Sequence, residues 1–109
     1  MEKIGKIDHY YMERFARFLR KLEEKKDADG HSILHNSMIV YGSGNSDGNA
    51  HNHDNLPVLL AGKGGGAVKT GRHVKFPKET PLNNLWLAML QRVGVKQTNL
   101  GDSNGVLSL

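Results

Sequence analysis

Residues 38–61, MIVYGSGNSDGNAHNHDNLPVLLA, place two short apolar runs on either side of a long polar segment. The first run, residues 38–41, ends at Gly42, and the second, residues 56–61, ends at Gly62. Short apolar runs bounded by turn-forming residues predict β-strands that are covered on both faces. A segment as long as residues 42–55 with no structure of its own is usually functional or disordered. We therefore define residues 38–62 as a strand–loop–strand unit and look for function in its loop.

An amphipathic helix is predicted on each side of this unit. The first spans residues 1–26, where apolar side chains recur at steps of three and four at Ile4, Ile7, Tyr11, Phe15, Phe18, Leu19 and Leu22. The second spans residues 80–94, with Thr80 as the N-cap, Pro81 in the first helical position and Gly94 as the C-terminal cap. The order helix, strand, strand, helix predicts an α/β fold.

The remaining segments are connections. Asp27 to Gly30 is a turn cluster, and Ser32 is placed to cap the short turn that follows it. Residues 63–79 form a glycine-rich basic loop, and residues 95–109 a tail that could end in a short strand over residues 106–109. Two strands alone are marginal in water, so we expect the sheet to be covered by further strands or by self-association into a homo-oligomer.

Composition narrows the class of protein. The chain has 109 residues, of which 38% are hydrophobic, so it fits one small domain with a thin core. It has no cysteine, which excludes disulfides and thiol chemistry. It has no apolar run of membrane-spanning length and no export signal at its N-terminus. The net charge of +4 is modest and lacks interleaved aromatic residues, so nucleic-acid binding is not expected.

Charge is distributed unevenly along the chain. Residues 32–55 contain no lysine or arginine but carry Asp47, His51, His53 and Asp54. Imidazole and carboxylate groups are the ligands that divalent zinc, iron or manganese prefer where no thiolate is present. Asp47 follows the first strand, at the end where ligand sites of open α/β sheets gather. The loop therefore predicts a metal site, although a flexible polar loop with local Asn and Asp turns is nearly as good an interpretation.

The glycine-rich stretch GKGGGAVKT, residues 62–70, resembles a phosphate-binding loop but departs from it. Val68 stands where the motif requires glycine, and no helix is predicted after Thr70. Its backbone N–H groups, together with Lys63, Lys69 and Arg72, could still bind an anion. A solvated basic loop is the simpler alternative. No serine is marked as a nucleophile, so the catalytic residues are not assigned.

Several long strings resemble one family. YGSGNSDGNAHNHDNLPVLLAGKGGG, TGRHV, TPLNNLWLAMLQRVGV and LGDSNG are similar to the C-terminal part of a bacterial family named for an HXXSHH motif. The opening HYYMERFARFLRKL and DADGHSILHNSMIVYGSG resemble that family's stretch before its last strands. The family is grouped with the alkaline phosphatase-like superfamily of phosphatases, sulfatases and related enzymes.

The resemblance implies a metal-dependent hydrolase fold acting on phosphate or sulfate esters. It implies that Asp47 is a ligand of a divalent metal, zinc before iron, manganese or calcium, that His51 and His53 come next, and that His73 is a more distant candidate. Family members are longer, and neither the HXXSHH motif nor the N-terminal half with its nucleophile is present here. We therefore expect a C-terminal fragment of an alkaline phosphatase-like fold that is inactive alone and that the missing N-terminal half would complete.

Two further interpretations stay open. The chain could be a stand-alone metal- or anion-binding module that self-associates, or a structural remnant without a ligand. Members of the family usually carry an export signal, so the resemblance suggests an exported or periplasmic full-length protein. The chain itself leaves the localisation unknown.

Overall fold

The computed structural model describes residues 2–109 and shows a small α/β domain with two helices and a two-stranded antiparallel sheet. In chain order these are helix α1 (Glu2–Glu24), strand β1 (Ile39–Gly42), strand β2 (Val58–Ala61), the 3₁₀ turn η1 (Gly64–Gly66) and helix α2 (Asn83–Arg92). The two helices and the two strands of the strand–loop–strand unit expected from the sequence are present. Met1, which the predicted first helix included, lies outside the described residues.

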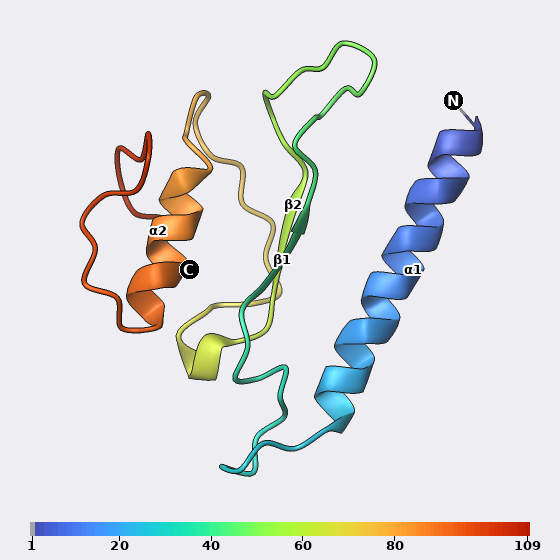
Figure 1. Ribbon diagram of the computed structural model, residues 1–109. Coiled ribbons are helices and arrows are strands. Elements are labelled where there is room, and N and C mark those ends of the chain that lie inside the picture. The colour runs from blue at the N-terminus through green and yellow to red at the C-terminus, as the bar shows by residue number, and fades with distance from the viewer. Residues whose placement is uncertain (1) are drawn as a thin grey trace.

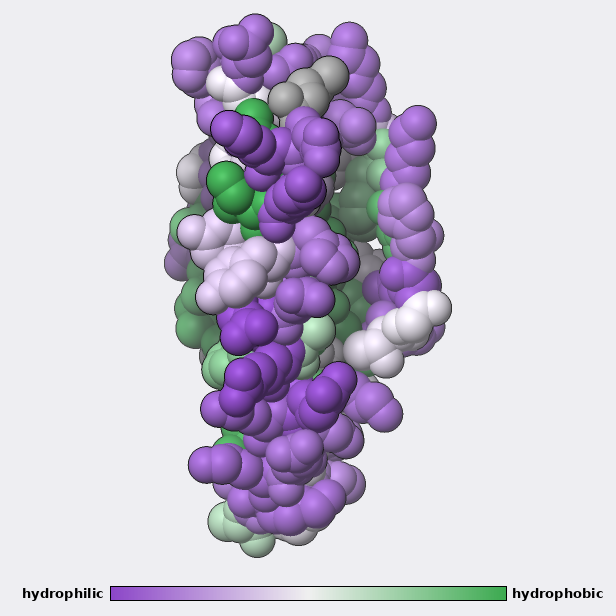
Figure 2. All heavy atoms as spheres, turned by 90° about the vertical axis from the view of Figure 1, so that its right-hand side faces the viewer, coloured by the Kyte–Doolittle hydropathy of each residue, from purple (hydrophilic) through white to green (hydrophobic). Residues whose placement is uncertain are grey.

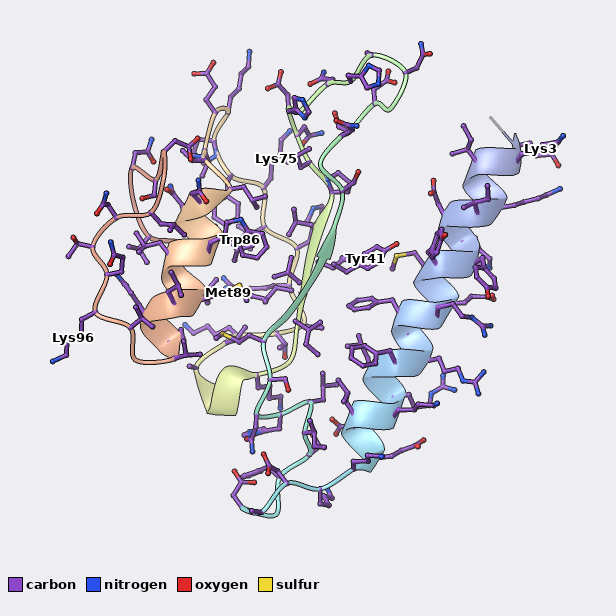
Figure 3. The ribbon with its side chains drawn as sticks, viewed as in Figure 1. Lys3, Tyr41, Lys75, Trp86, Met89 and Lys96 are labelled. Carbon is purple, nitrogen blue, oxygen red and sulfur yellow. The ribbon has the colours of Figure 1, made fainter. Side chains whose placement is uncertain are left out.

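The two strands pair so that the sheet has two different faces. The register places Val40 opposite Leu60 and Tyr41 opposite Leu59. Successive side chains of a strand point to opposite faces, so Val40 and Leu60 share one face and Tyr41 and Leu59 share the other. The Val40 face packs against the buried core. The other face is turned toward α1, and Tyr41 projects from β1 in that direction (Figure 3).

The core lies between the sheet and α2. Its buried members are Val68, Leu85, Leu87, Ala88 and Leu109, three of them from α2. Trp86 and Met89 project from α2 toward the sheet (Figure 3), and Met89 packs against this cluster. The core is small because the helix that supplies most of it has ten residues.

The C-terminal tail is fixed to α2 by asparagine side chains. Asn84 is buried, and its amide exchanges two hydrogen bonds with Asn104: its Nδ2 donates to the side-chain oxygen, and its Oδ1 accepts from the backbone N–H, both at 2.9 Å. Leu107 N–H then donates to the backbone oxygen of Asn84. Residues 106–109 do not form the short strand that the sequence predicted. They have no regular secondary structure and pack against α2.

The start of α2 also differs from the prediction. The helix begins at Asn83 rather than at Pro81, and the Thr80 hydroxyl donates to the oxygen of Pro77 instead of capping the helix. A tight turn over Pro81 and Leu82 leads into the helix, with Asn84 N–H donating to the oxygen of Pro81. Thr80 thus stabilises the preceding loop.

Helix α1 stands apart from the rest of the molecule (Figure 1). Among residues 2–24 none is buried, and Ile4, Ile7, Tyr11 and Phe18 are about half exposed. Its main contact with the sheet is the stack of Phe15 on Tyr41, with ring centroids 4.8 Å apart. Figure 2 shows that the outer side of α1 is mainly hydrophilic, so its apolar side chains face the space beside the sheet.

The overall dimensions agree with this loose arrangement. The radius of gyration is 15.6 Å, against about 13 Å for a compact domain of 100 residues. A helix held by few contacts extends the molecule without adding to its core. No helix within residues 2–109 has the length and apolar character needed to span a membrane.

Candidate functional site

The loop between β1 and β2 closes on itself in its outer half. Ser46 N–H donates to the oxygen of Asn52 at 2.8 Å, and Asn52 N–H donates to the oxygen of Asp47 at 3.2 Å. This short antiparallel bridge isolates residues 48–51 as a tight turn. The outer half of the loop is therefore a turn closed by its own backbone hydrogen bonds.

Asp47 stabilises that turn with one of its two carboxylate oxygens. Oδ1 accepts from the backbone N–H groups of Asn49 at 2.9 Å and Ala50 at 3.2 Å. This is the local Asx-type bonding that aspartate favours in turns. Oδ2 takes no part in it and remains the oxygen that a cation could bind.

His53 is oriented by a backbone carbonyl. Its Nδ1 lies 2.6 Å from the oxygen of Gly44. A carbonyl oxygen can only accept, so Nδ1 carries the proton and Nε2 is left with its lone pair. Histidines that bind metals are commonly oriented in this way, with the second ring nitrogen donating to a carbonyl or carboxylate. His51 sits at the tip of the loop with a φ of 51°, in the left-handed region.

The four residues predicted as metal ligands are not assembled into a complete centre. Asp47, His51 and His53 share the exposed hairpin loop, whereas His73 lies in the connection between η1 and α2. Within residues 2–109, no three His, Asp or Glu side chains are grouped so as to hold a metal ion. The loop thus presents single, separately oriented ligand atoms.

The expected place of Asp47 at the carboxyl edge of an open α/β sheet is wrong. The rule that ligand sites gather at that edge concerns mainly parallel strands. Because β1 and β2 are antiparallel, the loop is a hairpin connection and that rule does not apply to it. What favours Asp47 and His53 is their own hydrogen bonding.

The glycine-rich stretch does not offer the backbone donors expected for an anion. Gly64 N–H donates to the oxygen of Ser37 and Gly65 N–H to that of His35. The N–H groups of residues 66–68 bond within the stretch itself. The N–H groups of residues 64–68 are therefore not available to an anion at this loop.

The three predicted anion-binding side chains have different surroundings. Arg72 donates from Nε to the oxygen of Lys69 at 3.0 Å and from Nη2 to that of Ser108 at 2.9 Å. It therefore ties the tail to the loop. Lys69 is exposed, and Lys63 lies beside a hollow under the C-terminal end of α1. Of the three, only Lys63 lines a hollow in which a ligand could bind.

Residues 27–36 form a network of side-chain hydrogen bonds that the sequence did not predict. Asn36 Nδ2 donates to Asp27 Oδ2 at 3.0 Å and to Asp29 Oδ2 at 2.8 Å, and Asn36 Oδ1 lies 2.9 Å from Nδ1 of His35. The rings of His31 and His35 stack with centroids 4.1 Å apart. The only available signal was the turn cluster DADGH, which indicated a turn and no more.

These hydrogen bonds perturb the two carboxylates. The Asn36 amide, followed by the backbone N–H of Ala28, lowers the pKa of Asp27 below its ordinary value. The backbone N–H of His31, followed by the Asn36 amide, lowers the pKa of Asp29. Both carboxylates are therefore held in their charged form.

Comparison with family models, with curated proteins and with solved structures finds no match to the chain.

Proposed function

We propose that this chain is the metal-binding C-terminal segment of a metal-dependent hydrolase-like protein of the phosphate or sulfate ester class. The observation that supports this is His53, whose Nδ1–H donates to Gly44 and whose Nε2 is thereby left for a cation. Asp47 adds a second oriented ligand atom on the same loop. The class of ester comes from the resemblance of the loop to the HXXSHH family.

The donor set fits a divalent metal, zinc before iron, manganese or calcium. One carboxylate and one oriented imidazole are suitable ligands, and His51 could add a third from the loop tip. His73 is a further candidate from another connection. A divalent metal bound there would polarise the ester and stabilise its developing charge. In this proposal the chain's own contribution is to hold Asp47 and His53 at a defined distance along one closed loop.

The proposal also requires a partner surface. Two or three ligands leave the coordination shell of a metal ion incomplete, so further ligands must come from elsewhere. Separately, the apolar side of α1 is about half exposed and could be covered by a partner. We propose that a second copy of the chain or the N-terminal half of the hydrolase-like protein covers this side and completes the centre. The chain alone is then inactive as an enzyme.

The test is zinc binding by the purified chain, measured by calorimetry and by thermal unfolding. A metal that binds only the folded state stabilises it by about 2.7 kcal/mol at 100 times its dissociation constant. We expect His53→Ala and Asp47→Asn each to remove most of this stabilisation. Asp47→Asn is informative because an amide oxygen can still accept from Asn49 and Ala50, so the turn is retained while the charge is lost.

The control is His9→Ala, which removes an exposed histidine of α1 that pairs only with Glu13. It should leave zinc binding unchanged, so that adventitious binding to surface histidines is recognised. Equal zinc stabilisation in the native chain, Asp47→Asn and His53→Ala would contradict the proposal. So would a failure of zinc, iron, manganese and calcium all to bind.

A further inference from the structure

The polar hollow beside Lys63 lies away from the hairpin loop, where the C-terminal end of α1 meets the segment after β2. Its volume is about 440 Å³, within the range of small-ligand sites. Its polar lining comes from three parts of the chain: Glu23 and Lys26 at the end of α1, His31 and His35 in the following turn, and Lys63 and Thr70 beyond β2. Leu34 and Leu60 supply apolar wall.

The protonation of His35 follows from its neighbours. Both hydrogen atoms of the Asn36 amide are directed to Asp27 and Asp29, so the Asn36 oxygen must be the acceptor for the His35 ring. Nδ1 of His35 therefore carries a proton. Nε2 is left as the ring nitrogen that can receive a second proton and donate to a ligand.

Two of the three charged side chains that line the hollow are basic. These are Lys26 and Lys63, against Glu23, whose Oε2 accepts from the Ser32 hydroxyl at 2.7 Å. The carboxylates of Asp27 and Asp29 lie outside this lining and accept from the Asn36 amide. Two nearby carbonyls are occupied: the oxygen of Leu22 in α1 accepts from Leu34 N–H, and that of Lys25, just after the helix, from Ile33 N–H. The lining therefore offers an anion two ammonium groups and the histidine rings as donors.

The stacked imidazoles make this charge depend on pH. Histidine gains its proton between about pH 8 and 5, but two imidazolium rings 4.1 Å apart repel each other. The groups that face the pair are Glu23 from α1, Lys26 just after it, Asp27 and Asp29 through Asn36, and Lys63 from beyond β2. A bound anion would reduce the repulsion between the rings, so anion binding and proton uptake should favour each other.

We propose that this hollow binds a small divalent oxyanion, a sulfate or phosphate group, through Lys26, Lys63 and the protonated His31–His35 pair. The proposal is independent of the metal site, because it shares no residue with the hairpin loop. Of the three anion-binding residues expected from the sequence, only Lys63 lines this hollow; Lys69 and Arg72 do not.

The test uses sulfate, whose charge is constant across the histidine titration range. Sulfate is titrated into the native chain at constant ionic strength while the ring signals of His31 and His35 are followed by NMR. We expect saturable shifts with a dissociation constant on the order of 1 mM. The affinity should be several-fold higher at about pH 6 than at about pH 8.

Lys63→Gln and Lys69→Gln form the matched pair. Both lysines are exposed and neither side chain is needed by the core, so both variants should fold like the native chain. Lys63→Gln should weaken sulfate binding by about tenfold, and Lys69→Gln by less than about twofold. Equal losses in the two variants, no saturation, or an affinity that rises with pH would overturn the proposal.

Discussion

Asn36 holds two carboxylates and an imidazole with a single amide group. A neutral side chain with two donors and one acceptor can bridge charged neighbours without adding charge. This is why Asp27 and Asp29 can lie close together in one turn. The oxygen of Asn36 also determines which nitrogen of His35 carries the proton. Asn36 thereby sets which ring nitrogen of His35 is left for a ligand in the hollow, although Asn36 does not line the hollow itself.

Replacing Asn36 by alanine should raise the pKa of Asp27, because it removes the largest cause of its lowering. A pKa lowered by folding contributes stability above the ordinary value of 3.8. That contribution is lost as the pH falls through the folded value. The native chain should therefore lose more stability on acidification than Asn36→Ala does.

Carboxyl carbon NMR of Asp27 measures this pKa directly. Asn99→Ala, which changes an exposed asparagine of the tail, should leave the titration of Asp27 unaltered. If Asn36→Ala also left it unaltered, the assigned network would be wrong.

Among the elements, the join between β2 and η1 brings two backbone segments into close contact at Gly62. Gly62 has a φ of +89°, and a Cβ there would overlap the oxygen of Ser37 and lie 2.8 Å from that of Leu34. Only glycine permits this approach of two backbone segments. The close contact allows Gly64 and Gly65 to donate to residues 37 and 35, which joins the turn before β1 to the turn after β2.

Gly62→Ala should therefore cost on the order of 3 kcal/mol of unfolding free energy, from backbone strain and steric overlap together. Gly65→Ala is the matched control. It also has a positive φ, +67°, but nothing lies within 4 Å of its Cβ position, so it should cost about 1 kcal/mol. Urea unfolding of the two variants measures the difference, and equal losses would contradict the packing described for Gly62.

In the whole molecule, two larger areas of apolar surface are left uncovered among other, scattered exposed apolar side chains. One is the side of α1 that faces the sheet, with Ile7 and Phe18 about half exposed. The other is a hollow of about 660 Å³ between α2 and η1, whose lining includes Met38, Trp86 and Met89. Extended apolar patches on a small protein commonly mark interaction surfaces.

We accordingly expect the purified chain to self-associate at micromolar concentration. The double substitution Ile7→Lys with Phe18→Lys should shift it to a monomer, because charge on the apolar side of α1 opposes its burial. Val106→Lys, at an exposed apolar residue of the tail, should leave the association unchanged. Light scattering measures the mass, and a monomeric native chain would contradict the expectation.

The candidate site could be predicted from the sequence only as a list of residue types. Asp47 and His53 were identified because a cation-free loop concentrates ligand side chains. The partners of those side chains, Asn49 and Gly44, depend on how the loop closes. The Asn36 network and the hollow beside Lys63 unite segments far apart in the chain, so no local pattern indicated them.

The two helices and the two paired strands could be predicted from the sequence, because their signals are local. The periodicity of residues 4–22 produced α1, and the cap of Ser32 on His35 N–H formed as expected. Only the tertiary structure decided which partners the backbone and polar groups take. It made the strands an antiparallel hairpin and used the backbone N–H groups of residues 64–68 within the fold. Periodicity fixes the face of one element, but hydrogen-bond partners depend on segments that meet only after the chain has folded.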